Sequence, residues 1–175
     1  WVFSKYSNFN GSSFNRFYIY LATQDSVHAP IIQNMNDAFD IDFQKIIFNS
    51  DGTKFMQIST VGLMQQFNFD RCSGIISNPV VIFPELNQTI HGRNFWTGAY
   101  SADDSKFYVA TQIFSVSINP TSRLFQFDLT APNIAASIDT LWEIQYPAQC
   151  GALRLAPDNK IYFSTFYDFG FPGYP

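Results

Sequence analysis

The residues that could carry out chemistry are few, and they lie far apart in the sequence. The two histidines, His28 and His91, lack the spacing of a metal-binding pair and have no neighbouring cysteine pair. The chain contains no Gly-x-Ser-x-Gly nucleophile motif and no glycine-rich phosphate loop. We therefore predict no catalytic residues, no metal site and no cofactor, and we interpret His91 as a loop residue that bonds to backbone groups. A Ser-His-Asp arrangement assembled by the fold stays open.

Two groups of aspartates have the composition of a calcium site, since calcium binds several oxygen ligands. The first is the Asp103–Asp104 pair, whose setting is better explained by the chemistry of a tight turn. The second is formed by Asp37, Asp40 and Asp42 in the segment DAFDID, and it is the more plausible of the two. A solvated loop remains the default interpretation of that segment.

The overall composition limits the classes of protein to which the chain can belong. Of 175 residues, 46% are hydrophobic and only 14% are charged, and the net charge is −4. Average proteins carry about 25% charged residues, and disordered chains combine low hydrophobicity with high charge. The composition excludes disorder and argues against a nucleic-acid partner, which would require a basic stripe. No apolar run approaches the ~18 residues of a membrane helix, so we predict no membrane span.

The elements that must position these residues are β-strands. Short runs rich in aromatic and β-branched residues alternate with turn-forming Gly, Asn, Asp, Pro and Ser, which is the pattern of strands. No sustained helical periodicity occurs. The runs that predict strands are residues 14–21, 55–61, 63–70, 107–111, 124–129 and 161–165.

A turn marker recurs three times along the chain. An apolar strand is followed by Asp51-Gly52, by Asp103-Asp104 and by Asp158-Asn159, and each pair is followed by a lysine and a second apolar strand. Gly, Asp and Asn tolerate positive φ, and an aspartate side chain can cap the backbone N–H groups of its own turn. We therefore predict a tight hairpin at each site, with the lysine directed to solvent beside the aspartate.

A second marker recurs in phase with the first. The segment Phe67-Asn68-Phe69-Asp70 matches residues 125–128, which read Phe-Gln-Phe-Asp. Because strand side chains alternate, both phenylalanines of each segment face one side and the polar residues face the other. Two independent markers in the same order at a similar period indicate a structural repeat.

A repeat of roughly 40–55 residues with four short strands is typical of a β-propeller blade. We predict an all-β fold in which 1–175 form one partial β-propeller domain with about three blades' worth of four-stranded antiparallel sheets. Residues 1–36 would end one blade, 37–88 and 89–147 would each form a blade, and 148–175 would start a further one. Propellers close with roughly four to eight blades, so the segment would belong to a larger closed propeller. A β-sandwich is the alternative.

The same placement predicts that the two cysteines do not pair with each other. Cys72 lies in the hairpin between the third and fourth strands of one blade, and Cys150 begins a strand two blades on. A disulfide requires Cα atoms within about 7 Å.

Several segments resemble a known family. Residues 51–54 are similar to the S-P-D-G-x-K turn of TolB-like and WD40-like propeller repeats, with Asn49-Ser50 in place of Ser-Pro. Residues 67–79 and 151–162 resemble propeller segments of large exported proteins that carry gliding-motility-associated C-terminal domains. The resemblance implies export by the type IX secretion system and a location outside the cell or on its outer surface.

These observations together predict a non-catalytic binding or scaffold module of an exported protein, acting in adhesion or surface-complex assembly. Its partners would be a protein or carbohydrate ligand and the rest of the propeller. The alternatives are a propeller enzyme acting on glycans or peptides, and an accessory subunit of the secretion or gliding machinery. The sequence assigns no binding residues, although two aromatic groups are candidates for a binding platform as well as for core packing. They are Phe95, Trp96 and Tyr100, and the terminal group Phe166, Tyr167, Phe169, Phe171 and Tyr174.

Overall fold

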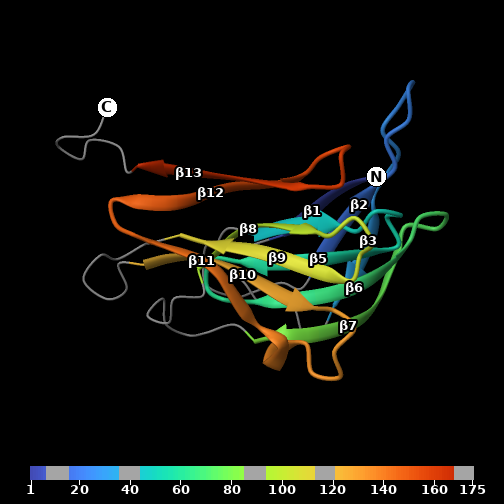
Figure 1. Ribbon diagram of the computed structural model, residues 1–175. Helices are drawn as coiled ribbons and strands as arrows, with labels where there is room; N and C mark the ends of the chain where they lie inside the picture. Colours follow the sequence, from blue (N-terminus) through green and yellow to red (C-terminus); the bar gives the residue numbers. More distant parts are fainter. Residues whose placement is uncertain (7–15, 36–43, 85–93, 113–120, 168–175) are drawn as a thin grey trace.

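The chain folds into four antiparallel β-sheets, each built from strands that follow one another in the sequence (Figure 1). The computed structural model describes residues 1–6, 16–35, 44–84, 94–112 and 121–167. Within these ranges there is no α-helix, and a single 3₁₀ turn, η1 (Ala135–Ser137), precedes β11. The all-β prediction is confirmed.

The two central sheets have four strands each, and the outer two are smaller. The first sheet contains β1 (Val2–Tyr6), β2 (Arg16–Tyr20) and β3 (Ile31–Asn34). The second contains β4 (Gln44–Phe48), β5 (Lys54–Ser59), β6 (Met64–Asp70) and β7 (Ile75–Phe83). The third contains β8 (Phe95–Tyr100), β9 (Lys106–Thr111), β10 (Thr121–Asp128) and β11 (Asp139–Gln145). The fourth contains β12 (Ala148–Leu155) and β13 (Ile161–Tyr167).

Each sheet packs its face against the next sheet along the chain. The first and second sheets share a core of aromatic and aliphatic side chains that includes Phe17, Phe55 and Phe67. The second and third share a core that includes Met56 and Phe107, and a smaller core around Leu153 joins the third to the fourth. The sheets therefore succeed one another like the blades of a propeller, which distinguishes the fold from a two-layer sandwich.

The Phe-x-Phe-Asp segments supply this packing, as the alternation predicts. Phe67 and Phe69 on β6 face the first sheet, and both are almost completely buried. Phe125 and Phe127 on β10 are equally buried and face the second sheet. The aspartate that ends each segment caps the following turn, since Asp70 accepts from the backbone N–H of Cys72 at 2.8 Å.

The repeated hairpin turns have the predicted geometry. Gly52, Asp104 and Asn159 occupy the same place in the three turns, and all have positive φ, between 58° and 71°. The preceding aspartate caps its own turn in each case: Asp51 accepts from Thr53 N at 2.8 Å, and Asp103 and Asp158 do the same two residues on. The prediction of tight, aspartate-capped hairpins is confirmed.

The prediction for the lysine after each turn holds only in part. Lys160 lies beside Asp158, with Nζ 3.6 Å from the carboxylate. Lys106 turns away from its own turn and forms an ion pair of 2.7 Å with Asp128 on the neighbouring strand. The antiparallel register places Lys106 directly opposite Asp128. The lysine therefore pairs with this cross-strand aspartate and not with Asp103 of its own turn.

Polar bonds also connect each sheet to the next. Gln33 on β3 makes two bonds to the backbone of Ile76 on β7, of 3.1 and 2.8 Å. The Asp104 carboxylate accepts from the backbone N–H and the hydroxyl of Ser50, at 3.0 and 2.6 Å, across the second and third sheets. The backbone N–H of Cys150 donates to the Ser122 hydroxyl at 3.0 Å. These hydrogen bonds fix the position of each sheet relative to the next.

Truncation of a repeat phenylalanine tests the packing between the sheets. Phe127→Ala should destabilise the protein by about 3–5 kcal/mol, because it removes a fully buried ring and leaves a cavity. Chemical denaturation measures the change, with Phe166→Ala as a control at a position that is 39% exposed. A loss under about 1 kcal/mol for Phe127→Ala would contradict the placement of this ring.

A substitution at Gly52 tests the turn geometry. Gly52→Val should lower the melting temperature, because a β-branched residue is strained at a φ of +71° and its Cβ would lie 3.2 Å from the Arg71 side chain. Asn159→Gly is the matched control at the equivalent position of another turn, and it should leave the melting temperature unchanged or slightly raised. An unchanged melting temperature in Gly52→Val would reject the turn assignment.

Candidate functional site

The first strands of three successive sheets enclose an open cavity of about 740 Å³. Strands β4, β8 and β12 lie next to one another, and together with the turn that follows β4 they supply all the described residues of its wall. Each of these strands is the edge strand of its sheet, so the convergence of three edges creates the hollow. The described wall residues are 45–50, 97–100 and 152–155.

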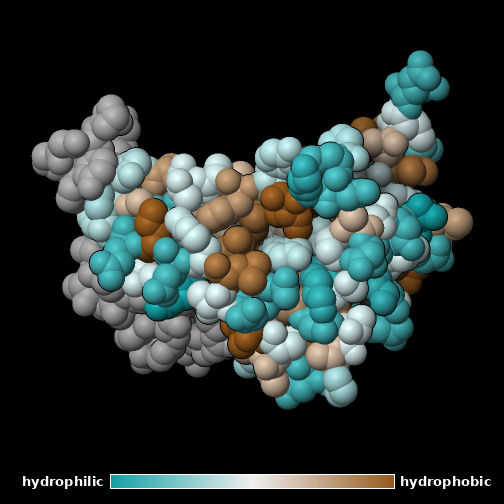
Figure 2. Space-filling model, in the orientation of Figure 1, coloured by the Kyte–Doolittle hydropathy of each residue, from teal (hydrophilic) through white to brown (hydrophobic). Residues whose placement is uncertain are grey.

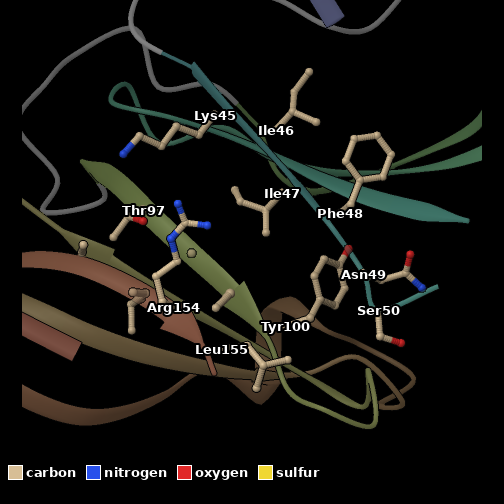
Figure 3. A pocket seen from close by; sticks show the side chains of 14 residues that line it. Lys45, Ile46, Ile47, Phe48, Asn49, Ser50, Thr97, Tyr100, Arg154 and Leu155 are labelled. Carbon is tan, nitrogen blue, oxygen red and sulfur yellow. The ribbon is translucent and has the colours of Figure 1, made fainter. Parts of the chain in front are cut away.

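Two cations, Lys45 on β4 and Arg154 on β12, give the cavity its charge. In Figure 3 the Arg154 side chain extends into the space between Ile47 and Thr97, and Lys45 lies along the same rim. The Lys45 Nζ stands 4.9 Å from the centre of the Trp96 ring, a cation–π contact. Partial burial and the nearby positive charge of Arg154 lower the pKa of Lys45. No acidic side chain occurs among the described residues of the wall.

The remaining wall is apolar with a few hydroxyl groups. Ile47 and Leu155 supply aliphatic surface, and Thr97 supplies a hydroxyl. Tyr100 is almost fully buried, and this burial raises the pKa of its phenol to about 12. The phenol therefore stays neutral at physiological pH and is unsuited to act as a general base there.

Lys45 and Arg154 could not be predicted as site residues, because no binding or catalytic motif includes them; Arg154 lies in residues 151–162, which indicate only the propeller repeat. The available signal was a cation within a mostly apolar strand of an acidic chain. Burial decides whether the aromatic candidates near this site form a binding platform or pack in the core. Phe95 and Tyr100 belong to the core between the second and third sheets. Trp96 is half-buried and contributes its ring face to Lys45.

Of the other candidate residues that the structure describes, neither His28 nor the Asp103–Asp104 pair is among the wall residues of this cavity. His28 is exposed between β2 and β3, and its backbone N–H donates to the carbonyl of Leu21. His91 and the aspartates Asp37, Asp40 and Asp42 lie outside the described residues. Among the residues that are described, no group of three His, Cys, Asp or Glu side chains is arranged to hold a metal ion.

The Asp103–Asp104 pair serves the turn, as its sequence setting predicts. Asp103 accepts from the hydroxyls of Ser101 and Ser105 at 2.6 and 2.9 Å, and these bonds lower the pKa of its carboxyl to about 2. The Asp104 carboxylate is taken up by the bonds to Ser50 described above. Both carboxylates are thus engaged by donors of the hairpins.

The cysteines are both free and lie in different settings. Cys72 is exposed in the turn between β6 and β7, whereas Cys150 is buried in β12. Burial raises the pKa of the Cys150 thiol, so it behaves as a packing residue.

A second, smaller groove lies between the third and fourth sheets. It has a volume of about 240 Å³, and its apolar wall residues include Leu124, Leu141 and Phe163. Figure 2 shows apolar side chains grouped near the centre of this view, over β9–β11 and below the β12–β13 hairpin. Of the terminal aromatic candidates, Phe166 and Tyr167 are 39% and 50% exposed on β13, and Phe169, Phe171 and Tyr174 lie outside the described residues.

Comparison with solved structures supports the propeller architecture. A luciferin-regenerating enzyme superposes on the chain with a TM-score of 0.53 at 15% sequence identity. The match covers 86% of this chain and 44% of that protein, so the chain spans less than half of its solved neighbour. No protein-family model and no curated protein matches the sequence. At this identity the likeness shows the fold alone, which is a β-propeller-like array of antiparallel sheets, two of which have four strands in the described residues.

The comparison also corrects one prediction. The finding contradicts the expectation that the chain is not an enzyme, because one solved protein with a similar fold is named as an enzyme. The sequence argument rested on missing motifs, and a propeller assembles its sites from strands far apart in the chain, where no motif is needed.

In the described part of the chain, no helix has the length and hydropathy to cross a membrane.

Acid titration tests the role of the turn aspartates. The pKa of Asp103 is lowered from its ordinary value of 3.8 to about 2, and that of Asp128 is lowered by Lys106 and Thr130. A depressed carboxyl pKa stabilises the fold at neutral pH, and this stability is lost as the pH falls from about 4 toward 2. Asp103→Asn should therefore lower the melting temperature at pH 7 and reduce its further fall between pH 4 and pH 2.

The measurement is a thermal melt at each pH, with Asp25→Asn in the loop between β2 and β3 as a control for the loss of one negative charge. Equal slopes for the wild-type protein and Asp103→Asn over this pH range would contradict the assignment.

Proposed function

We propose that the chain is a ligand-binding module and that its ligand occupies the cavity between β4, β8 and β12. The observation that supports this proposal is a hollow of about 740 Å³ whose wall combines apolar side chains with polar and positively charged ones. Binding sites for small ligands have volumes of roughly 300–1,000 Å³ and this mixture of surfaces. A protein or carbohydrate segment is the expected ligand, since both present polar groups on a partly apolar body.

The module would belong to a larger closed propeller. The groove beside the β12–β13 hairpin supports this part of the proposal, because Leu141 is exposed there and Leu124 and Phe163 are only partly buried. In a four-stranded sheet of the same kind, two further strands would lie beyond β13 and cover such a surface. Closure with further blades would also complete the ring around the cavity.

Export to the cell surface or medium is the proposed setting. The support is the resemblance of residues 67–79 and 151–162 to propeller segments of exported proteins with gliding-motility-associated C-terminal domains. The uncharged, Asn- and Ser-rich surface is consistent with this setting. Adhesion or surface-complex assembly would follow from ligand binding there.

A second candidate function is a propeller enzyme with the same cavity as its substrate site. The shared fold with a protein named as an enzyme favours it. Incubation of the full natural protein with glycans and peptides, followed by mass spectrometry of the products, distinguishes this candidate from binding alone.

A bulky substitution in the cavity wall tests the proposed site. Ala152 lies in the wall and is exposed, so Ala152→Trp should fill part of the hollow and leave the cores between the sheets intact. On an array of oligosaccharides and peptides, the variant should lose most of the binding of the wild-type protein. Ala136→Trp, in η1 and remote from the cavity, is the matched control. Binding of the same ligands with equal strength by Ala152→Trp would overturn the cavity as the site.

A further inference from the structure

We propose that the cavity selects ligands with an oxyanion group, a carboxylate, sulfate or phosphate, which Arg154 and Lys45 bind together. This inference rests on the proposed function, because it names the ligand chemistry of the same cavity. The argument uses the charge balance of the wall, the partners of the two cations and the shape of the guanidinium.

The charge balance of the wall is opposite to that of the chain. The whole sequence has 10 basic and 14 acidic residues, yet the described residues of the wall include two cations and no carboxylate. Lys45 and Arg154 reach the cavity from strands β4 and β12, which belong to different sheets. The fold thus places two exposed cations in one hollow of an acidic protein, and two like charges at one site raise the local attraction for an anion.

The two cations differ in their partners from three other cations of the described residues, whereas Arg16, Lys54 and Arg71 likewise have no carboxylate oxygen within 4 Å there. Lys106, Arg123 and Lys160 each have a carboxylate oxygen within 4 Å. Among the described residues, neither Lys45 nor Arg154 has such a partner, and Lys45 contacts the Trp96 ring instead. Two cations that repel each other, with no carboxylate oxygen within 4 Å among the described residues, are an unfavourable arrangement. An anion bound between them would offset that repulsion.

The chemistry of the two groups suits an oxyanion. A guanidinium is planar and can donate two parallel hydrogen bonds to a carboxylate, sulfate or phosphate. The Trp96 ring restricts the position of the Lys45 ammonium, so it acts as a second, partly fixed charge on the rim. Ile47 and the Thr97 hydroxyl border the space into which Arg154 extends (Figure 3), and they would contact the uncharged body of the ligand.

Calorimetric titration of the full natural protein tests this inference with three probes. Trigalacturonate carries carboxylates on a sugar body, maltotriose is a neutral sugar of the same length, and inorganic phosphate is the anion alone. We expect trigalacturonate to bind, maltotriose to bind at least tenfold more weakly, and added salt to weaken the binding of trigalacturonate. If phosphate competes with trigalacturonate, the oxyanion site itself accounts for the recognition.

Charge variants assign the binding to the two residues. Arg154→Gln and Lys45→Gln should each weaken trigalacturonate binding by about tenfold or more, as expected for loss of a charged hydrogen bond. Lys160→Gln is the matched control, because it removes the same charge from the turn of the same sheet outside the cavity. It should bind like the wild-type protein. Thermal melts of each variant establish that the fold is retained.

The outcomes separate this inference from the proposed function on which it rests. If Ala152→Trp abolishes binding while both charge variants bind normally, the cavity is the site and the oxyanion inference is overturned. If the charge variants lose binding while Ala152→Trp binds normally, the anion is held outside the cavity, which overturns the proposed function. Equal affinity for maltotriose and trigalacturonate, or no binding of any anionic probe at millimolar concentration, also overturns the inference.

Discussion

The structure depends on one constraint: the two central sheets are apolar on both faces. Strand β5 shows this directly, since Phe55 packs toward the first sheet while Met56 and Ile58 pack toward the third. A sheet of this kind is stable only when another sheet covers each face. Each large apolar side chain left exposed would forgo about 1.5–3 kcal/mol of the stabilising free energy that burial provides. Stacking in sequence order satisfies the requirement locally. It transfers the same requirement to the last sheet, where Leu155 on β12 remains 37% exposed and Tyr162 on β13 remains 58% exposed.

The candidate site follows from the same stacking. Sheets that pack face to face with their first strands side by side place β4, β8 and β12 around one hollow. The bonds from Asp104 to Ser50 and from Cys150 to Ser122 set the register between successive sheets, so they also set how the cavity walls meet. The turns and cores therefore position the strands that bring Lys45 and Arg154 to the same cavity.

The parts of the fold that could be predicted from the sequence are those set by local patterns of residues. Asp51, Asp103 and Asp158 could be assigned to capped turns because the capping bond spans only two residues. The buried phenylalanines could be assigned because strand alternation is equally local. The cation pair could not be predicted, because Lys45 and Arg154 are neighbours only after three sheets have stacked. The partner of Lys106 was missed for a related reason, since the pairing register of β9 and β10 decides it.

The intact mass of the natural polypeptide, with peptide mapping beyond residues 1 and 175, tests most directly whether these sheets are blades of a larger closed propeller. The account predicts a longer chain that contains further copies of both the aspartate-capped turn and the Phe-x-Phe-Asp segment. A natural polypeptide of only these 175 residues would contradict closure within one chain. The uncovered face of the last sheets would then have to be buried by another subunit, or the array would be open.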